Sequence, residues 1–174
     1  NGALTYSLNQ QVIRSIPMDQ ALSRKIQVLC EEAGMYFEFF TNNGVYSKSR
    51  EHFLEVMIDI MKSANPNLSE AEIREGAEQR FQAEKVQFIQ DYDDVFQMDG
   101  VRIYKILGFS MDRKRLAEIR DALQNEEELV VTSSGDTNIE FNHPDAQKGI
   151  ALDSFAKSKG IEMKDVMALG DNFN

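Results

Sequence analysis

The sequence predicts an α+β domain, an antiparallel sheet with helices on one face, joined to part of a parallel α/β domain. Between residues 17 and 142, amphipathic helical segments alternate with pairs of β-prone runs, an order typical of an α+β sheet. Residues 143–174 instead contain a helical segment, an apolar run and a Gly-Asp turn. That order is typical of a buried parallel strand that ends in a loop.

Pairs of β-prone runs joined by short polar turns predict the strands. The turn signals are a polar link after residue 8, Asn42-Asn43-Gly44, and Ser134-Gly135-Asp136. The expected strands cover residues 4–8, 12–16, 35–40, 45–46, 101–109, 129–133, 137–141 and, at the end of the chain, 165–169.

Apolar residues at helical spacing predict the helices. Gly34 should end the first helix, and Ser69 with Glu72 forms a capping box at the start of the third. The expected helices cover residues 19–33, 50–63, 69–91, 112–123 and 148–158.

Charge and composition limit the classes of partner. The chain has 19 basic and 29 acidic residues and a net charge of −10, which disfavours nucleic acid and anionic membranes as partners. No apolar run approaches the roughly 18 residues of a membrane span. A small phosphorylated molecule remains compatible, because one lysine and a metal ion can bind it locally. Whether the protein is a monomer or a homo-oligomer is left open.

The single cysteine indicates the redox environment of the protein, and the first residue indicates how the chain begins. Cys30 has no partner for an internal disulfide, so we expect a reducing, cytoplasmic environment and a buried, inert thiol. The chain starts with Asn1 and lacks an initial methionine. We therefore expect it to be a piece of a longer polypeptide, called the parent protein below.

Two segments near the end of the chain contain the candidate residues for binding a metal ion and a phosphate. Gly170-Asp171-Asn172 follows the apolar run, at the kind of strand end where α/β enzymes hold metals or phosphates. Lys148-Gly149 opens the preceding helix. A lysine and an acidic turn on adjacent loops suit a Mg²⁺–phosphate site. The alternatives are an ordinary helix-start lysine and a plain turn aspartate.

The tail "KGIALDSFAKSKGIEMKDVMALGDNFN" resembles the third and fourth motifs of the haloacid dehalogenase (HAD) superfamily, in particular Cof-type phosphatases of sugar phosphates and related metabolites. The opening "NGALTYSLNQQVI" resembles their segment between the core strand and the cap. "YFEFFTNNGVYS" and "ELVVTSSGDTNIEF" are similar to their cap hairpins. The resemblance covers nearly the whole chain. It implies a core fragment and hairpin at residues 1–16, a C2-type cap at 17–142, and a core fragment with motifs three and four at 143–174. The Rossmann-like core would then be only partly present in this chain.

The resemblance also implies roles for individual residues. Lys148 matches the motif-three lysine, which would neutralise charge on the nucleophile and the phosphoryl oxygens, and Asp171 matches a Mg²⁺ ligand of motif four. The remaining matches are positions expected near the phosphate or substrate: Asn1, Gly2, Asn172 and Asn174.

The nucleophilic Asp-x-Asp motif of this family has no counterpart here. Asp91-Tyr92-Asp93 has the spacing but follows a predicted helix, so we expect a solvated helix end. The resemblance thus implies a fragment of a Mg²⁺-dependent phosphatase that is inactive alone. In such enzymes the cap loops select the substrate. The candidates here are the turns at residues 41–44 and 134–136, and the alternative is that both are plain exposed polar turns. The alternative is a non-catalytic binding or regulatory module that retains the cap fold.

Overall fold

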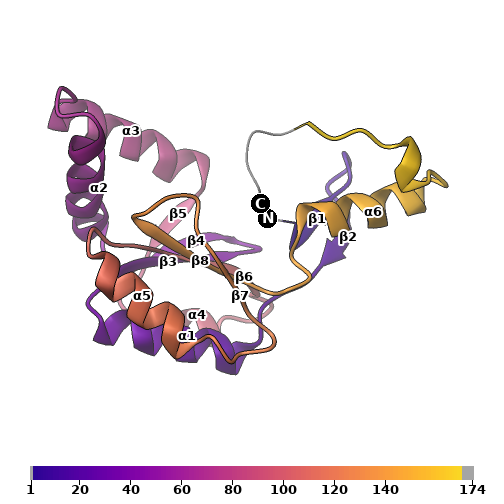
Figure 1. The fold of residues 1–174 in the computed structure, drawn as a ribbon, viewed down its shortest axis with the longest axis horizontal. Coiled ribbons are helices and arrows are strands. Elements are labelled where there is room, and N and C mark those ends of the chain that lie inside the picture. Colours follow the sequence, from indigo (N-terminus) through magenta and orange to yellow (C-terminus); the bar gives the residue numbers. More distant parts are fainter. Residues whose placement is uncertain (1, 170–174) are drawn as a thin grey trace.

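The computed structural model describes residues 2–169, and these residues form one small and one large sheet (Figure 1). The small sheet is an antiparallel pair, β1 (Leu4–Tyr6) and β2 (Val12–Ser15). The large sheet has the order β5-β4-β3-β6-β8-β7. Its strands are β3 (Tyr36–Thr41), β4 (Gly44–Ser47), β5 (Val86–Phe88), β6 (Ile103–Phe109), β7 (Val130–Thr132) and β8 (Asn138–Asn142).

The helices begin where the sequence places capping side chains. Ser69 and Glu72 form the expected capping box, and Asp19 and Asp112 each accept a hydrogen bond from the first turn of their helix. The helices are α1 (Gln20–Glu32), α2 (Arg50–Ala64), α3 (Glu70–Ala83), α4 (Asp93–Gln97), α5 (Arg113–Ala122), α6 (Lys148–Ser158) and the 3₁₀ turn η1 (Met163–Asp165). None of these helices combines the length and apolarity needed to cross a bilayer.

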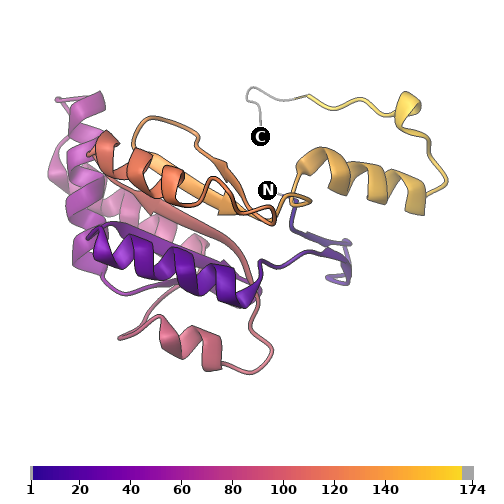
Figure 2. The same cartoon turned by 60° about the horizontal axis from the view of Figure 1, so that its bottom comes forward.

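One face of the large sheet is covered by α1 and α5, which lie side by side in Figures 1 and 2. Phe39, Ile106 and Phe141 are paired across β3, β6 and β8, so their side chains point to the same face. All three are fully buried, in one apolar cluster with Ile26 of α1 and Ile119 of α5. This cluster is the main core of the molecule.

The sheet is mixed, and helices lie on both of its faces, so the expectation of an antiparallel sheet with helices on one face was wrong. β5 pairs in parallel with β4. A parallel pair needs a crossover connection, and α2 with α3 supplies it. This helix pair packs on the second face, where Phe53, Phe81 and Tyr36 form a separate cluster.

The predicted helix over residues 69–91 is too long, because α3 ends at Ala83. Lys85 adopts a positive φ of 54°, which no helix can continue, and β5 follows. Phe88 therefore lies on a strand and not on a helix. The turn was missed because left-handed backbone at a helix end usually occurs at glycine, which is absent here.

The predicted strand over residues 165–169 was also wrong for the described residues. Residues 163–165 form η1, and residues 166–169 pair with no described strand. Met167 and Leu169 are 85% and 93% exposed. An apolar run becomes a buried parallel strand only when neighbouring strands bond to both of its edges.

A buried ion pair fixes α3 to the second face of the sheet. Glu38 of β3 is fully buried and accepts two hydrogen bonds from the Arg80 guanidinium, at 2.9 and 2.6 Å. The Tyr36 hydroxyl donates to the same carboxylate at 2.6 Å and lies 2.9 Å from the Ser47 hydroxyl. The buried charge is therefore compensated in full, as burial requires.

The thiol of Cys30 should resist chemical modification in the folded protein. Cys30 is fully buried in the main core, and this burial, with the nearby charge of Glu31, raises the pKa of its thiol. Because the thiolate is the reactive form, we expect no reaction with Ellman's reagent at pH 8 until the protein unfolds. Prompt stoichiometric labelling of the native chain, with unfolding excluded by circular dichroism, would contradict this placement.

Candidate functional site

Lys148 is the first residue of α6 and is exposed to solvent. The preceding loop is ordered by its own hydrogen bonds, since the Ala146 amide donates to the His143 carbonyl at 2.9 Å and the Gln147 side chain donates to the Pro144 carbonyl at 2.9 Å. The side chain of the N-cap residue, Gln147, forms no capping hydrogen bond to the helix start. The backbone amides of the first helical turn and the Lys148 ammonium group therefore lie together at a helix start that favours anions.

Gly2 lies against the start of α6, although almost the whole described chain separates the two in sequence. A Cβ atom built on Gly2 would lie 2.5 Å from the Gln147 carbonyl oxygen and 2.8 Å from the Lys148 backbone nitrogen. Gly2 also has a φ of +97°. Only glycine satisfies both conditions. The structure thus brings two of the predicted site residues, Gly2 and Lys148, into contact.

Arg14 of β2 holds this contact together. Its guanidinium donates to the Gly2 carbonyl at 2.8 Å and to the Asp145 carbonyl at 2.8 Å. A fixed planar fork of donors suits such a bridge between two backbone segments. Next to it, Ala3, Tyr104 and Ala146 form a small buried cluster. The beginning of the chain, the large sheet and the loop before α6 are therefore joined at one point.

A cavity of about 190 Å³ opens at this junction. Its walls come from the second face of the large sheet and from the loop that leads into α6. The lining residues are Lys105, Val130, Thr132, Glu140, Asn142, His143, Pro144, Ala146, Gln147 and Lys148. Lys148 therefore lies on a concave surface whose lining combines polar side chains with exposed apolar atoms.

The hydrogen bonding of His143 defines its tautomer. The Asp145 backbone amide donates to Nδ1 of His143 at 3.0 Å, so this nitrogen is unprotonated and the neutral ring carries its proton on Nε2. His143 is thus held as a donor through its other nitrogen.

The described residues do not form a metal site. Within residues 2–169, no three His, Cys, Asp or Glu side chains gather as a metal site requires. Asp171, the expected Mg²⁺ ligand, lies outside the described residues, as do Asn1, Asn172 and Asn174.

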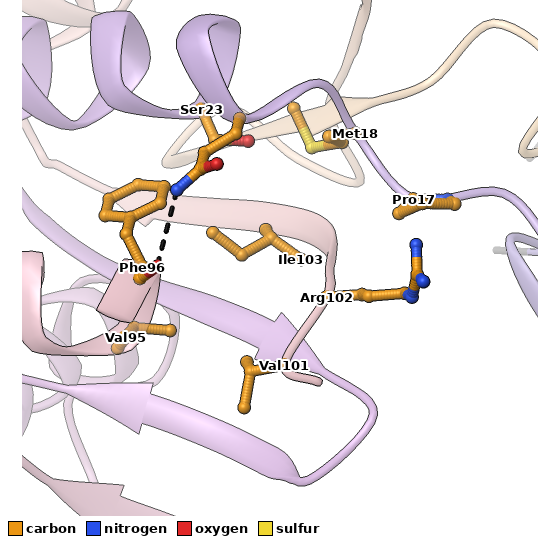
Figure 3. A pocket seen from close by; sticks show the side chains of 9 residues that line it. Pro17, Met18, Ser23, Val95, Phe96, Val101, Arg102 and Ile103 are labelled. Atoms are coloured by element: carbon orange, nitrogen blue, oxygen red, sulfur yellow. Dashed lines mark hydrogen bonds between the residues drawn. The ribbon is translucent and has the colours of Figure 1, made fainter. Parts of the chain in front are cut away.

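A second cavity, of about 200 Å³, lies between the start of α1, α4 and the start of β6 (Figure 3). Gln20 spans it with a hydrogen bond to the Phe96 carbonyl at 3.4 Å, and Arg102 is the charged residue of its lining. Its lining combines apolar residues such as Val95 and Ile103 with exposed polar atoms. It lacks the acids and bases of a reaction centre, so Lys148 and its cavity remain the candidate site.

Residues 1–174 match the family model of haloacid dehalogenase-like hydrolases. The chain belongs to this family. It is 33% identical over its whole length to the Bacillus subtilis 5-amino-6-(5-phospho-D-ribitylamino)uracil phosphatase YwtE and 27% identical to the B. subtilis phosphatase YwpJ. The chain spans 61% and 62% of the length of these two relatives.

Solved structures of HAD-like hydrolases share the fold. A HAD-like hydrolase from B. subtilis superposes with a TM-score of 0.78 and 26% identity, covering 95% of this chain and 59% of that one. The HAD phosphatase BT1666 from Bacteroides thetaiotaomicron superposes with a TM-score of 0.69 and 18% identity, covering 99% of this chain and 54% of that one. The second likeness supports the fold alone.

In the two turns that are candidates for substrate selection, several polar groups already form hydrogen bonds within the protein. Thr41 accepts from the Asn43 amide and donates to the Gly44 carbonyl. The Asn138 side chain binds the amides of Ser134 and Gly135. Neither turn lines the cavity beside Lys148. The strand residues that do line it carry a recognisable signal, polar side chains at alternate positions of otherwise apolar strands.

Asp91 and Asp93 are exposed and precede or begin α4, so they lie at the start of a helix and not at its end. Asp93 pairs with Arg24 at 2.6 Å, and Asp91 accepts a hydrogen bond from the Asp93 amide. Tyr92 between them is buried and donates to the Phe37 carbonyl. These contacts give the segment a structural role.

Proposed function

We propose that this chain is the substrate-selecting part, and one part of the phosphate site, of a HAD-like phosphatase acting on small phosphate monoesters. The observation that carries the proposal is the contact of Gly2 with the start of α6 at Lys148. This contact brings together Gly2 of the opening segment and Lys148 of the tail, two segments that each resemble a different part of the HAD core. A purely structural pair of segments would not need a cation at an amino-terminal helix end, where it opposes the helix dipole.

The proposed domain division is a core fragment and hairpin at residues 1–16, a C2-type cap at 17–142 and a second core fragment at 143–174. Its support is the separation of the large sheet from β1, β2 and α6, visible in both views (Figures 1 and 2). The Arg14 bridge between Gly2 and Asp145 ties the two proposed core fragments together.

In the proposed reaction, an aspartate of the parent protein attacks the phosphorus and displaces the alcohol of the ester, whose oxygen takes up a proton. Water then hydrolyses the aspartyl-phosphate to inorganic phosphate and the free aspartate. Lys148 would neutralise the charge that the transferring phosphoryl oxygens carry. Gly2 and Asn1, with Asn172 and Asn174, would bind the phosphate or substrate, and Asp171 would bind Mg²⁺. The Mg²⁺ dependence and the cytoplasmic location rest on the family resemblance and on the lone cysteine.

The experiment compares the full-length parent protein with this 174-residue chain in Mg²⁺-dependent hydrolysis of p-nitrophenyl phosphate. The panel should include 5-amino-6-(5-phospho-D-ribitylamino)uracil, because the relative YwtE is named for it. We expect an active parent, inhibition by EDTA and an inactive chain. A parent inactive across a broad panel of phosphate esters would overturn the proposal in favour of a non-catalytic binding module.

A further inference from the structure

The second face of the large sheet is only half covered by helices. α2 and α3 pack over Tyr36 and Val86, at the β3-β4-β5 side. On the other side, the register of β6, β8 and β7 aligns Leu107 with Glu140 and Thr132 on this same face. Phe109, at the end of β6, still packs against this helix pair. We call the remaining part of the β6-β8-β7 half, with Lys105, Glu140 and Asn142, the open face. The cavity beside Lys148 lies at one end of it.

The open face holds an opposite pair of charges that do not neutralise each other. Lys105 and Glu140 are both half-buried and both line the cavity. Within residues 2–169 neither takes part in an ion pair, whereas Arg80 and Glu38 on the covered half of the face pair fully. The Lys105 ammonium lies 4.0 Å from the centre of the Phe40 ring, which holds it on this face.

Partial burial without a partner is unfavourable for both groups, and a ligand that hydrogen-bonds to them would remove the penalty. Two further polar groups are fixed nearby. Asn142 is 6% exposed and its amide nitrogen lies 3.5 Å from the Thr132 hydroxyl, and His143 is held with its proton on Nε2. The cavity thus presents an acceptor, a cation and oriented amide and imidazole groups within about 190 Å³.

We infer that Lys105 and Glu140 determine the specificity of the phosphatase for its leaving group. This inference rests on the proposed function. Glu140 accepts hydrogen bonds from hydroxyl or amino groups of the leaving group, and Lys105 donates to its hydroxyl or carbonyl oxygens. The preferred substrate is therefore the phosphate ester of a polyhydroxylated or amine-bearing alcohol. Apolar leaving groups, which would leave both charges unpaired, are disfavoured.

The test uses the full-length parent protein and the variants Lys105→Met and Glu140→Gln, both close in size to the native residues. Control variants are Lys114→Met and Glu118→Gln on α5, on the opposite side of the sheet, whose ammonium and carboxylate groups lie 3.5 Å apart at the surface. Each protein is assayed on p-nitrophenyl phosphate and on a panel of sugar and polyol phosphates. Thermal unfolding confirms that each variant is folded.

For the best polyol substrate, we expect kcat/KM to fall by about 10- to 100-fold in each cavity variant, mostly through KM, with p-nitrophenyl phosphate changed less than about threefold. The control variants should have the wild-type kcat/KM on both the polyol phosphate and p-nitrophenyl phosphate. An equal loss on both substrates, or no loss on either, would overturn the assignment of specificity while the phosphatase activity stands. An inactive wild-type parent would overturn the proposed function and this inference with it.

Discussion

Replacing Lys148 by alanine should lower kcat of the phosphatase reaction proposed for the parent protein by about 10²- to 10³-fold, the loss typical when one preorganised charge-stabilising donor is removed. The side chain is exposed at the first position of α6, so the variant should fold. Because the lysine is proposed to act mainly on charge in the transition state, kcat should fall more than KM rises. Steady-state kinetics on p-nitrophenyl phosphate measures both quantities.

Lys157→Ala is the matched control for this prediction. Lys157 lies in the last turn of α6 and pairs at the surface with Asp153, at 2.7 Å. Its replacement removes a lysine from the same helix without touching the cavity, so kcat should remain within about twofold, as expected for a surface ion pair. Equal activity of Lys148→Ala and Lys157→Ala would reduce Lys148 to an ordinary surface residue.

Replacing Arg80 by alanine should lower the free energy of unfolding by about 3–5 kcal/mol, because it leaves the Glu38 carboxylate charged and buried without its partner. Glu38 is fully buried, and Arg80 covers it from α3 in a two-bond contact. Urea unfolding of the 174-residue chain, followed by circular dichroism, measures the change.

Two comparisons separate the buried charge from simple loss of side-chain packing. The double variant Glu38→Met with Arg80→Met should recover most of the lost stability, since apolar groups can replace a buried pair. Arg113→Ala should change stability by less than about 1 kcal/mol, because the Arg113–Asp136 pair is 76% and 71% exposed. A double variant as unstable as Arg80→Ala would show that packing, and not the unpaired charge, is responsible.

Local signals predicted most elements of this fold. Asp19, Ser69 and Asp112 marked helix starts correctly, and Asn43-Gly44 marked a tight turn between β3 and β4. These features depend on neighbouring residues, so one sequence is enough to detect them.

The wrong predictions concern strands whose formation depends on pairing with residues that are distant in the sequence. β5 is a short strand, stabilised by its parallel pairing with β4 and by helices packed above it, and its sequence resembles a continuation of α3. Whether residues 166–169 form a strand depends on neighbouring strands, which the described residues do not supply. Sequence patterns cannot report such pairing, because the partner is remote in the chain.

For the candidate site, the sequence indicated some of the residues and missed others. The structure places Gly2 beside the start of α6 at Lys148, and the site roles of both residues stay predictions. Lys105 and Glu140 were not singled out, since a charged residue at an alternate strand position is usually solvated. Only the sheet register places them on one face, at a cavity beside Lys148.

A crystal structure of the full-length parent protein, with a tungstate or orthovanadate ion bound as a phosphate mimic, tests whether Lys148 and Gly2 form part of a phosphate site. We expect the anion at the start of α6, with the Lys148 Nζ within about 3.2 Å of an anion oxygen and Gly2 beside it. An anion bound at a different site, with the Lys148 side chain directed into solvent, would contradict it.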